Sequence, residues 1–332
     1  MGRLKIAVLG SGAWGTALAV QFSHRHTVCL WARDAVQVDK MRREHENLRY
    51  LPGIVLPDVL QISHELDVCL AGVDVILIAT PVAALRDMLT HVAQTTQNVP
   101  VVWVCKGFET GSMLLPHQVA ASILNPAVPR GVLSGPSFAA EVARGLPTAL
   151  TLASAEESMR HLAQDFHHHH LRVYTSTDVM GVEIGGAIKN VMAIAAGISD
   201  GLVLGHNARA ALIARGLAEI SRLGQAMGGR AETFMGLTGV GDLILTATSD
   251  QSRNRQVGLR LARGEKLPAI LRELGHVAEG VGAAREVARL ALISQVDMPI
   301  VQAVHRILYH DVSPLLAVAD LLNREPHAEV HL

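Results

Sequence analysis

A glycine-rich turn close to the N-terminus constrains the fold of this 332-residue chain more than any other feature. Residues 6–9 form an apolar run, typical of a strand that is covered on both faces of a parallel sheet. The run leads into G-S-G-A-W-G at residues 10–15, and a helical pattern follows. In this setting Gly10 allows the tight turn, Gly12 lets the backbone approach a pyrophosphate, and Gly15 packs the helix against the strand. The pattern predicts a dinucleotide-binding turn, and the alternative is a plain glycine-rich turn.

The end of the second predicted strand indicates which dinucleotide fits. Residues 27–32 are strand-like and end at Arg33 and Asp34. A dinucleotide fold usually places a carboxylate about 20 residues after the glycines, on the ribose 2′-hydroxyl, whereas an arginine there accommodates a 2′-phosphate. Because Arg33 comes first, the sequence favours NADP(H) and leaves NAD(H) open. The alternative is that Arg33 is a solvated loop charge.

Strand and helix patterns alternate through the first half of the chain. Further strand candidates lie at residues 73–81, 99–107, 131–137, 148–152 and 171–174. The alternation predicts an α/β fold with a Rossmann-type doubly wound sheet, whose ligands bind beyond the carboxyl ends of the strands. We therefore expect Thr80-Pro81, Lys106-Gly107 and Gly135-Pro136-Ser137 to line one crevice. The alternative is that these glycines and prolines only form turns.

The second half of the chain is predicted to be helical. Helical patterns lie near residues 179–201, 207–227, 252–263, 281–294, 298–309 and 314–323. Polar and β-branched residues accumulate at 174–178, where one domain is expected to end and the next to begin. The sequence thus predicts a dinucleotide-binding domain at residues 1–177 and an all-helical substrate-binding domain at residues 178–332.

Lys189 is a solitary cation in the nearly uncharged stretch of residues 184–197. The alanines, isoleucines and valines around it are typical of a buried helix. An ammonium group that loses its water has a lowered pKa, and a lysine with a pKa near neutrality can accept and return a proton. Lys189 is therefore a candidate general acid and base. The alternative is a lysine whose stem lies along apolar surface and whose head reaches solvent.

Three segments with charged residues in glycine-rich or polar settings complete the candidate site. Asp242 follows a glycine-rich stretch, and beside Lys189 it would orient the amine, but helix capping is an equally common use of aspartate. The string S-R-N-R at residues 252–255 offers guanidinium groups for a phosphate, or it is an exposed helix start. Glu279 could accept a hydrogen bond from a cofactor ribose or carboxamide, or it caps a turn.

Composition excludes several kinds of function. Twenty-nine basic and 30 acidic residues leave no excess charge for a nucleic acid. Cys29, Cys69 and Cys105 have no spacing typical of disulfides or of zinc, which suits a reducing compartment. No apolar stretch resembles a signal sequence or a membrane span, so we expect a cytoplasmic protein. The histidine run at residues 167–170 is interpreted as an exposed loop and not as a metal site.

Taken together, these motifs resemble one family, the bacterial-type NAD(P)-dependent glycerol-3-phosphate dehydrogenases. The resemblance extends from Ile6 to about Tyr309. Its motifs are GSGAWGTALA at residues 10–19, KG at 106–107, LSGPSFA at 133–139, GGAIKNV at 185–191, GVGDL at 239–243, QSRNR at 251–255 and VAEG at 277–280. The glycine turn is common to many enzymes, whereas the lysine, aspartate and S-R-N-R motifs together are specific.

The resemblance implies a reaction and a set of site residues. Dihydroxyacetone phosphate would be reduced by NAD(P)H to sn-glycerol 3-phosphate, reversibly, for glycerophospholipid synthesis. Lys189 would be the proton acceptor in the direction of alcohol oxidation, with Asp242 beside it. The implied substrate contacts are Lys106, Gly135, Ser137, Lys189, Asp242, Ser252, Arg253 and Asn254. Besides Gly10, Gly12 and Gly15, the cofactor contacts would be Ser11, Trp14, Arg33, Lys106, Ala139, Arg253, Val277 and Glu279.

Two other functions remain as alternatives. A β-hydroxyacid or 6-phosphogluconate-type dehydrogenase would also combine a sheet domain, a helical domain and a helical lysine. Such enzymes usually carry asparagine one helical turn after the lysine, where this chain has Ala193. A catalytically inert NADP(H)-binding sensor would keep the glycine turn and lose the catalytic residues.

A homodimer is the expected assembly, because closed two-fold dimers are the commonest oligomers.

Overall fold

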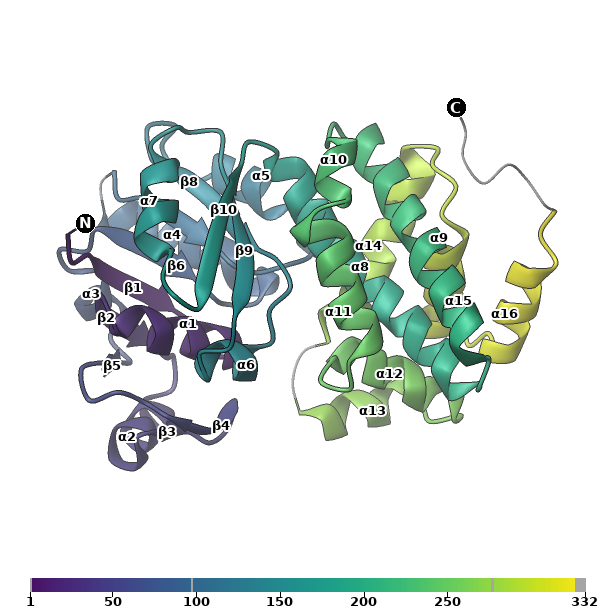
Figure 1. Ribbon diagram of the computed structural model, residues 1–332, viewed down its shortest axis with the longest axis horizontal. Coiled ribbons are helices and arrows are strands. Elements are labelled where there is room, and N and C mark those ends of the chain that lie inside the picture. Colours follow the sequence, from purple (N-terminus) through teal and green to yellow (C-terminus); the bar gives the residue numbers. More distant parts are fainter. Residues whose placement is uncertain (1, 97, 276–277, 326–332) are drawn as a thin grey trace. The chain divides into compact units, whose positions relative to one another are not determined.

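The structure is a computed structural model that describes residues 2–96, 98–275 and 278–325. The predicted cofactor contact Val277 lies outside these residues. The chain forms two compact units. The first comprises the chain up to Gly186 together with residues 228–242, and the second comprises residues 187–227 and the chain from Leu243 onward. Figure 1 shows that the first unit carries the sheet and that the second is built from helices.

The strands of the first unit confirm the predicted sheet. They are β1 (Lys5–Leu9), β2 (Thr27–Trp31), β3 (Glu46–Asn47), β4 (Leu51–Val55), β5 (Gln61–Ser63), β6 (Val75–Ile78), β7 (Val101–Trp103), β8 (Arg130–Ser134), β9 (Thr148–Ala153) and β10 (Leu171–Ser176). Eight of them form one sheet in the order β10-β9-β8-β7-β6-β1-β2-β5, and β3 pairs with β4. The pairing is parallel from β5 to β8, whereas β9 pairs antiparallel with β8 and parallel with β10.

Helices cover both faces of this sheet, which makes it doubly wound. The helical elements of the first unit are α1 (Ala13–Ser23), α2 (Ala35–Glu44), α3 (Leu66–Leu70), η1 (Val82–Ala84), α4 (Leu85–Thr95), α5 (Pro116–Ala121), α6 (Ala139–Ala143), α7 (Met159–Phe166), α10 (Ala231–Phe234) and the π-helical turn η2 (Leu237–Gly241). Ile6 and Val8 pack into a core with α1, α2, α6 and α7. Ala7 and Leu9, which alternate with them, pack into a second core with α3, α4 and α5. This alternation explains why β1 reads as a continuous apolar run.

The cysteines differ from the sequence-based expectation. Cys29 of β2 and Cys69 of α3 form a disulfide, and Cys105 is a buried free thiol. The expectation that the cysteines stay unpaired is therefore wrong for two of them. The sheet brings the pair together, because β2 and α3 contribute to the same core although 40 residues separate the two cysteines along the chain.

The second unit contains the helices that the sequence predicted and two that it missed. They are α8 (Val179–Gly201, which begins in the first unit), α9 (Gly205–Ala226), α11 (Asp242–Thr248), α12 (Arg253–Ala262), α13 (Leu267–Leu274), α14 (Glu279–Ile293), α15 (Pro299–Tyr309) and α16 (Pro314–Leu322). The missed helices, α11 and α13, are too short for a clear helical period. The predicted domain boundary falls just before α8, whereas the compact units divide inside this helix.

Helix α8 is a long, apolar and largely buried helix. It is long and apolar enough to cross a membrane, yet 89% of its most apolar window is buried inside the protein, as in the core helix of a globular fold. Glycines allow its backbone to touch α12. A Cβ atom at Gly197 would overlap the carbonyl oxygen of Arg255, and one at Gly258 would overlap that of Ile194. No side chain larger than hydrogen fits at either crossing.

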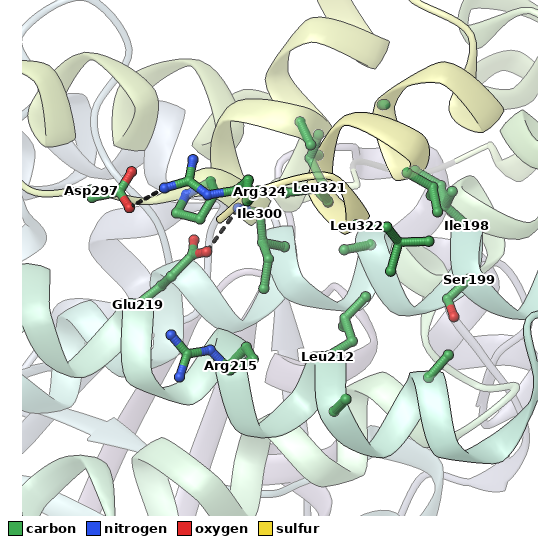
Figure 2. Close-up of a pocket in the computed structure, with 18 of the residues that line it drawn as sticks. Ile198, Ser199, Leu212, Arg215, Glu219, Asp297, Ile300, Leu321, Leu322 and Arg324 are labelled. Carbon is green, nitrogen blue, oxygen red and sulfur yellow. Dashed lines mark hydrogen bonds and ion pairs between the residues drawn. The ribbon is translucent and has the colours of Figure 1, made fainter. Parts of the chain in front are cut away.

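A buried carboxylate holds the start of α15. Glu219 of α9 accepts hydrogen bonds from the backbone N–H groups of Ile300 and Val301 at 2.8 and 3.2 Å, and Figure 2 shows the bond to Ile300. Burial raises the pKa of Glu219 to about 7, although these hydrogen bonds and nearby Arg222 oppose the shift and Asp297 adds to it. The carboxyl group therefore changes its charge near neutral pH.

This raised pKa predicts a pH-dependent stability. The folded-state pKa lies above the ordinary value of 4.5, so the stabilising contribution of protonated Glu219 is complete below pH 4.5 and is lost as the pH rises through about 7. Between pH 5 and 8, the free energy of unfolding should fall by about 2.5 kcal/mol relative to a Glu219→Gln variant. Urea denaturation at a series of pH values measures this difference. If the free energy of unfolding changed with pH in the same way in both proteins, the prediction would be contradicted.

Candidate functional site

The glycine turn has the geometry that a dinucleotide requires. Gly10 has φ of 125°, and a Cβ atom there would lie 2.7 Å from the carbonyl oxygen of Ala79. A Cβ atom at Gly15 would overlap the carbonyl oxygen of Gly10, so α1 packs directly on the turn. Gly12, by contrast, has open space where a Cβ would be, and no side chain caps α1. The first N–H groups of α1 thus remain available for phosphate oxygens.

The two charged residues after β2, Arg33 and Asp34, have different surroundings. Asp34 is the N-cap of α2, because its carboxylate accepts hydrogen bonds from the N–H groups of Val36 at 2.9 Å and Gln37 at 3.4 Å. Arg33 is exposed beside it. The side chain of Gln37 also donates a hydrogen bond to the hydroxyl of Ser11, at 3.3 Å, which connects α2 with the glycine turn. Helix capping thus occupies the carboxylate that an NAD-type fold would direct at the ribose.

An ion pair lies beyond the carboxyl ends of β7 and β8. The ammonium group of Lys106 contacts the carboxylate of Asp242 at 2.7 Å and donates a hydrogen bond to the carbonyl oxygen of Gly135 at 3.2 Å. The side chain of Asp242 is 1% exposed and that of Lys106 is 15% exposed. The hydroxyl of Ser137 also donates to Gly135, at 3.1 Å. Lys106, Gly135 and Ser137, three of the residues expected in one crevice, therefore lie together, and Asp242 joins them.

The sequence led us to expect Asp242 beside Lys189. Within the first unit, its cationic partner is Lys106. A buried carboxylate without a cation would cost several kcal/mol, and the contact with the Lys106 ammonium offsets that cost and holds the side chain of Asp242 in place. A direct role of Asp242 toward Lys189 stays a prediction.

The first turns of α8 pack closely around this ion pair. A Cβ atom at Gly185 would lie 2.5 Å from the carbonyl oxygen of Thr238, and one at Gly186 would lie 3.5 Å from the stem of Lys106. The two glycines of the GGAIKNV motif thus let α8 approach Lys106 and the chain just before Asp242. Lys189 follows Gly186 by three residues, which is about one turn of the same helix.

Glu183 anchors this part of α8 to the end of β7. Its buried carboxylate accepts hydrogen bonds from the indole N–H of Trp103 at 2.6 Å and from the backbone N–H of His117 at 3.0 Å. The Nδ1 atom of His117 lies 2.6 Å from the same carboxylate. Trp103 precedes Lys106 by three residues, so Glu183 connects the helix with the strand end that carries the lysine. The sequence reasoning missed Glu183, because an acidic residue inside an apolar helix does not reveal its distant partners.

Lys189 is buried in the second unit. The residue is only 7% exposed, and its ammonium group donates a hydrogen bond to the hydroxyl of Thr246 at 2.9 Å. The predicted burial is therefore confirmed, and the lysine head does not extend into solvent. Sequence reasoning missed Thr246. The available signal was its position four residues after Asp242 in α11, one helical turn further on.

At the start of α12, some polar side chains are bonded to other groups of the protein and one is exposed to solvent. Ser252 is its N-cap and accepts a hydrogen bond from the N–H of Arg255 at 3.2 Å. Arg255 is buried and forms ion pairs with Asp200 and Asp250 at 2.7 and 2.5 Å. Arg253, in contrast, is exposed. Of the two arginines in the S-R-N-R motif, Arg253 is thus the one whose guanidinium is at the surface.

An amide network links this helix start to α8 and α14. Asn254 donates a hydrogen bond to the side-chain oxygen of Asn190 at 3.0 Å and accepts one from the N–H of Gly280 at 3.0 Å. Asn190 is the neighbour of Lys189 in the chain. Glu279 is the half-buried first residue of α14, directly before Gly280. Three predicted site segments of the second unit are therefore held together by side-chain amides.

The remaining predicted cofactor contacts lie in the first unit. Trp14, in the first turn of α1, and Ala139, at the start of α6, are both half-buried, and α1 packs against α6. The described residues include no group of three or more histidine, cysteine or acidic side chains arranged to hold a metal ion. Of the histidine run, His167, His169 and His170 are exposed, as the loop interpretation expects.

The fold and these groups define a class of protein, the dinucleotide-dependent dehydrogenases that combine a Rossmann-type sheet with a helical unit. Two family models match the chain. NAD-dependent glycerol-3-phosphate dehydrogenase N-terminus matches residues 5–160, and NAD-dependent glycerol-3-phosphate dehydrogenase C-terminus matches residues 178–319. The chain belongs to the NAD-dependent glycerol-3-phosphate dehydrogenase family.

Similar proteins match along the whole chain. The glycerol-3-phosphate dehydrogenase [NAD(P)+] of Thiobacillus denitrificans is 57% identical, over 98% of this chain and all of that protein. The protein of the same name from Burkholderia orbicola is 58% identical over the same shares. The crystal structure of glycerol-3-phosphate dehydrogenase from Coxiella burnetii superposes with a TM-score of 0.93, at 43% identity, over 97% of this chain and 99% of that one.

The glycine turn yields a paired prediction. Gly15→Ala places a methyl group against the carbonyl of Gly10, so it should destabilise the protein by about 1–3 kcal/mol without ligand. Gly12→Ala meets open space and should change stability by less than about 0.5 kcal/mol, yet weaken coenzyme binding at least about 10-fold. Thermal denaturation and a fluorescence titration with NADPH measure the two effects. Equal losses of stability in both variants would contradict this division of roles.

Proposed function

We propose that this protein catalyses the reversible, NAD(P)H-dependent reduction of dihydroxyacetone phosphate to sn-glycerol 3-phosphate. The names of its relatives support this reaction. The observation that carries the proposal is the buried amine of Lys189, hydrogen-bonded to Thr246 and located in the family's GGAIKNV motif. Family membership favours this reaction over that of a β-hydroxyacid or 6-phosphogluconate-type dehydrogenase.

Lys189 provides the proton in this proposal. A bound nicotinamide supplies the hydride that adds to the carbonyl carbon. As the carbonyl oxygen gains negative charge, the ammonium of Lys189 stabilises it and donates the proton that completes the alcohol. In the reverse direction the neutral amine removes that proton. Thr246 orients the Lys189 amine by accepting one of its hydrogen bonds.

Lys106 and Asp242 position the reacting end of the substrate. Their ion pair fixes both side chains at the carboxyl ends of β7 and β8, so little reorganisation is needed when a polar ligand arrives. We assign Lys106, Gly135, Ser137 and Asp242 to substrate contacts, with Asp242 also in a catalytic role. The Lys106 ammonium retains a donor hydrogen for a substrate oxygen, because its two known hydrogen bonds use two of three.

The phosphate group is assigned to the start of α12. Arg253 offers a guanidinium that can bind two phosphate oxygens, and the N-terminus of the helix adds a partial positive charge. Ser252 and Asn254 contribute through the hydroxyl and the amide. Binding the phosphate fixes the position of the carbon that accepts the hydride, which lowers the entropic part of the barrier.

The cofactor is assigned mainly to the first unit. Its contacts are Gly10, Ser11, Gly12, Trp14, Gly15, Arg33, Lys106 and Ala139, joined by Arg253, Val277 and Glu279. The exposed guanidinium of Arg33, next to a capping Asp34, supports NADP(H) as the preferred coenzyme. We retain the division into a dinucleotide-binding domain at 1–177 and a substrate-binding domain at 178–332.

Loss of nicotinamide absorbance with dihydroxyacetone phosphate, assayed with NADPH and with NADH, tests both the proposed reaction and the proposed coenzyme preference. Coenzyme binding without turnover would instead indicate the inert sensor.

The cellular role and assembly are part of the same proposal. The product would supply the backbone of glycerophospholipids, and the reaction would take place in the cytoplasm. The Cys29–Cys69 disulfide is compatible with that compartment, because both cysteines are buried and reduction requires access to the sulfur. We propose a homodimer as the assembled form, with no nucleic-acid partner and no stable membrane insertion.

Removing the amine of Lys189 tests the acid–base role. Lys189→Ala should lower kcat at least about 100-fold, because it deletes the proton donor, while the Kd for NADPH stays within about 2-fold. Steady-state kinetics and coenzyme titration measure the two quantities. Lys266→Ala is a matched control, because this lysine is exposed in the same unit. Turnover close to the wild-type rate in Lys189→Ala would defeat the assignment.

Removing the guanidinium of Arg253 tests the phosphate contact. Arg253→Ala should raise the KM for dihydroxyacetone phosphate by about 10- to 100-fold, as expected for the loss of a charged hydrogen bond. Arg263→Ala, an exposed arginine at the other end of α12, should leave KM unchanged. An equal KM for dihydroxyacetone phosphate in the two variants would count against the contact between Arg253 and the phosphate.

A further inference from the structure

A side chain of the β3–β4 hairpin contacts the glycine turn. The two strands form a separate two-stranded sheet that follows α2 in the chain, and Figure 1 shows this hairpin next to α2. Asn47 of β3 is 1% exposed, and its side chain reaches Ser11, which lies 36 residues earlier. The sequence reasoning gave Asn47 no role. The structure thus connects the hairpin to the part of the chain that we assign to the coenzyme.

The side-chain amide of Asn47 has its donor and its acceptor directed at different elements. Its Nδ2 atom donates hydrogen bonds to the carbonyl oxygen of Ser11 and to the hydroxyl of Thr16, both at 2.8 Å. Its Oδ1 atom accepts from the backbone N–H of Tyr50 at 3.3 Å and from the side chain of Gln37 at 3.4 Å. A carbonyl oxygen only accepts and a backbone N–H only donates, so these contacts fix the orientation of the amide.

Two buried side chains hold the carbonyl oxygen of Ser11. The hydroxyl of Thr16, which is fully buried, donates a hydrogen bond to this oxygen at 3.2 Å, in addition to the bond from Asn47. A trans peptide unit is planar, and its C=O and N–H groups point in opposite directions. Fixing the Ser11 oxygen toward Asn47 therefore directs the N–H group of Gly12 away from Asn47. Gly12 also has open space where a side chain would be, which leaves room for a ligand.

We propose that Asn47 is a positioning residue for the coenzyme. Its amide holds the Ser11–Gly12 peptide so that the N–H group of Gly12 faces the pyrophosphate. A donor that is already aligned needs no reorganisation when the anion binds. Without the amide this peptide rotates more easily, and rotation turns a carbonyl oxygen, which repels phosphate, toward the ligand. The inference rests on the proposed coenzyme site and adds a residue that acts on it through Ser11 and Gly12.

The same network reaches the chain segment that follows β2. The side chain of Gln37 donates to the hydroxyl of Ser11 at 3.3 Å as well as to Asn47. Gln37 lies in the first turn of α2, whose N-cap is Asp34, next to Arg33. The two amides therefore connect the phosphate-binding turn with the helix start that we assign to the ribose end of the coenzyme. A residue that only stabilised the hairpin would need no donors directed at the turn.

Removing the amide of Asn47 tests the positioning role. Asn47→Ala should weaken the binding of NADPH, or of NADH if the wild type prefers it, at least about 10-fold. Gln21→Ala is the matched control, because Gln21 is also a buried amide of the first unit and donates to a backbone carbonyl, that of Ala143, at 3.2 Å. The control should lose stability and keep the Kd within about 2-fold. Fluorescence titration without substrate measures the Kd, and thermal denaturation measures the stability.

Thr16 gives a second test that leaves the hairpin side chains in place. Thr16→Val removes the hydroxyl that bonds to the Ser11 oxygen and to the Asn47 amide, so it should weaken coenzyme binding about 3- to 10-fold. Thr16→Ser returns a hydroxyl to the same position and should restore the binding. Neither substitution changes the charge, so the difference in Kd between the two variants reports the hydrogen bonds. This pair decides the inference if Asn47→Ala does not fold.

The kinetic constants separate positioning of the coenzyme from a part in the chemistry. In Asn47→Ala the KM for NADPH should rise with the Kd, while kcat at saturating NADPH stays within about 2-fold of wild type, because the turn binds the coenzyme and moves no proton. A lower kcat with an unchanged Kd would overturn the positioning role. So would an unchanged Kd in both Asn47→Ala and Thr16→Val, or an equal loss of affinity in Gln21→Ala.

The binding measurements do not depend on turnover. A wild-type protein that binds NADPH without reducing dihydroxyacetone phosphate would refute the proposed reaction, and the comparison of Kd values would still decide the role of Asn47. A wild-type protein that binds neither NADPH nor NADH would overturn both the coenzyme site and the inference. Turnover in the wild type together with wild-type Kd values in all variants would leave the reaction standing while the positioning role fails.

Discussion

Close backbone packing of α8 is the constraint on which the rest of the structure depends. Gly185 and Gly186 let the helix approach residues around the Lys106–Asp242 ion pair, and Gly197 lets it touch α12. Any Cβ atom at Gly185 or Gly197 would require the neighbouring backbone to move. These contacts set where Lys189 lies along a helix that is held at several points. Precise placement of one amine therefore depends on residues that themselves carry no chemistry.

Buried charge in this protein is paired with specific partners. Asp242 contacts Lys106, Glu183 receives the indole of Trp103, and Arg255 is held between Asp200 and Asp250. Each pairing offsets the cost of removing a charge from water, and each also connects elements that are distant in the sequence. The network therefore orients the strand ends and helix starts to which we assign the ligands. Residues such as Glu183 contribute to a site through position alone.

Much of the fold could be predicted from short patterns. The strand, turn and helix around Gly10, the parallel strands that follow and the long helix around Lys189 each depend on neighbours within about 20 residues. Short elements escaped prediction, as did the direction of β9, because a two-faced apolar strand looks the same in either direction. The Cys29–Cys69 pair also escaped, since the sheet alone brings β2 and α3 to one core.

The sequence by itself determined the residue types of the candidate site and their order: the glycine turn, the solitary lysine, the aspartate after glycines and the S-R-N-R string. Those features are local, because φ angles, helical period and charge in an apolar run act within a few residues. Only the tertiary structure decided which side chains contact one another. It paired Asp242 with Lys106, brought Thr246 to Lys189, made Asp34 a helix cap and buried Arg255 while exposing Arg253. Partner choice depends on which distant backbones pack together, and packing is a property of the whole fold that no local pattern contains.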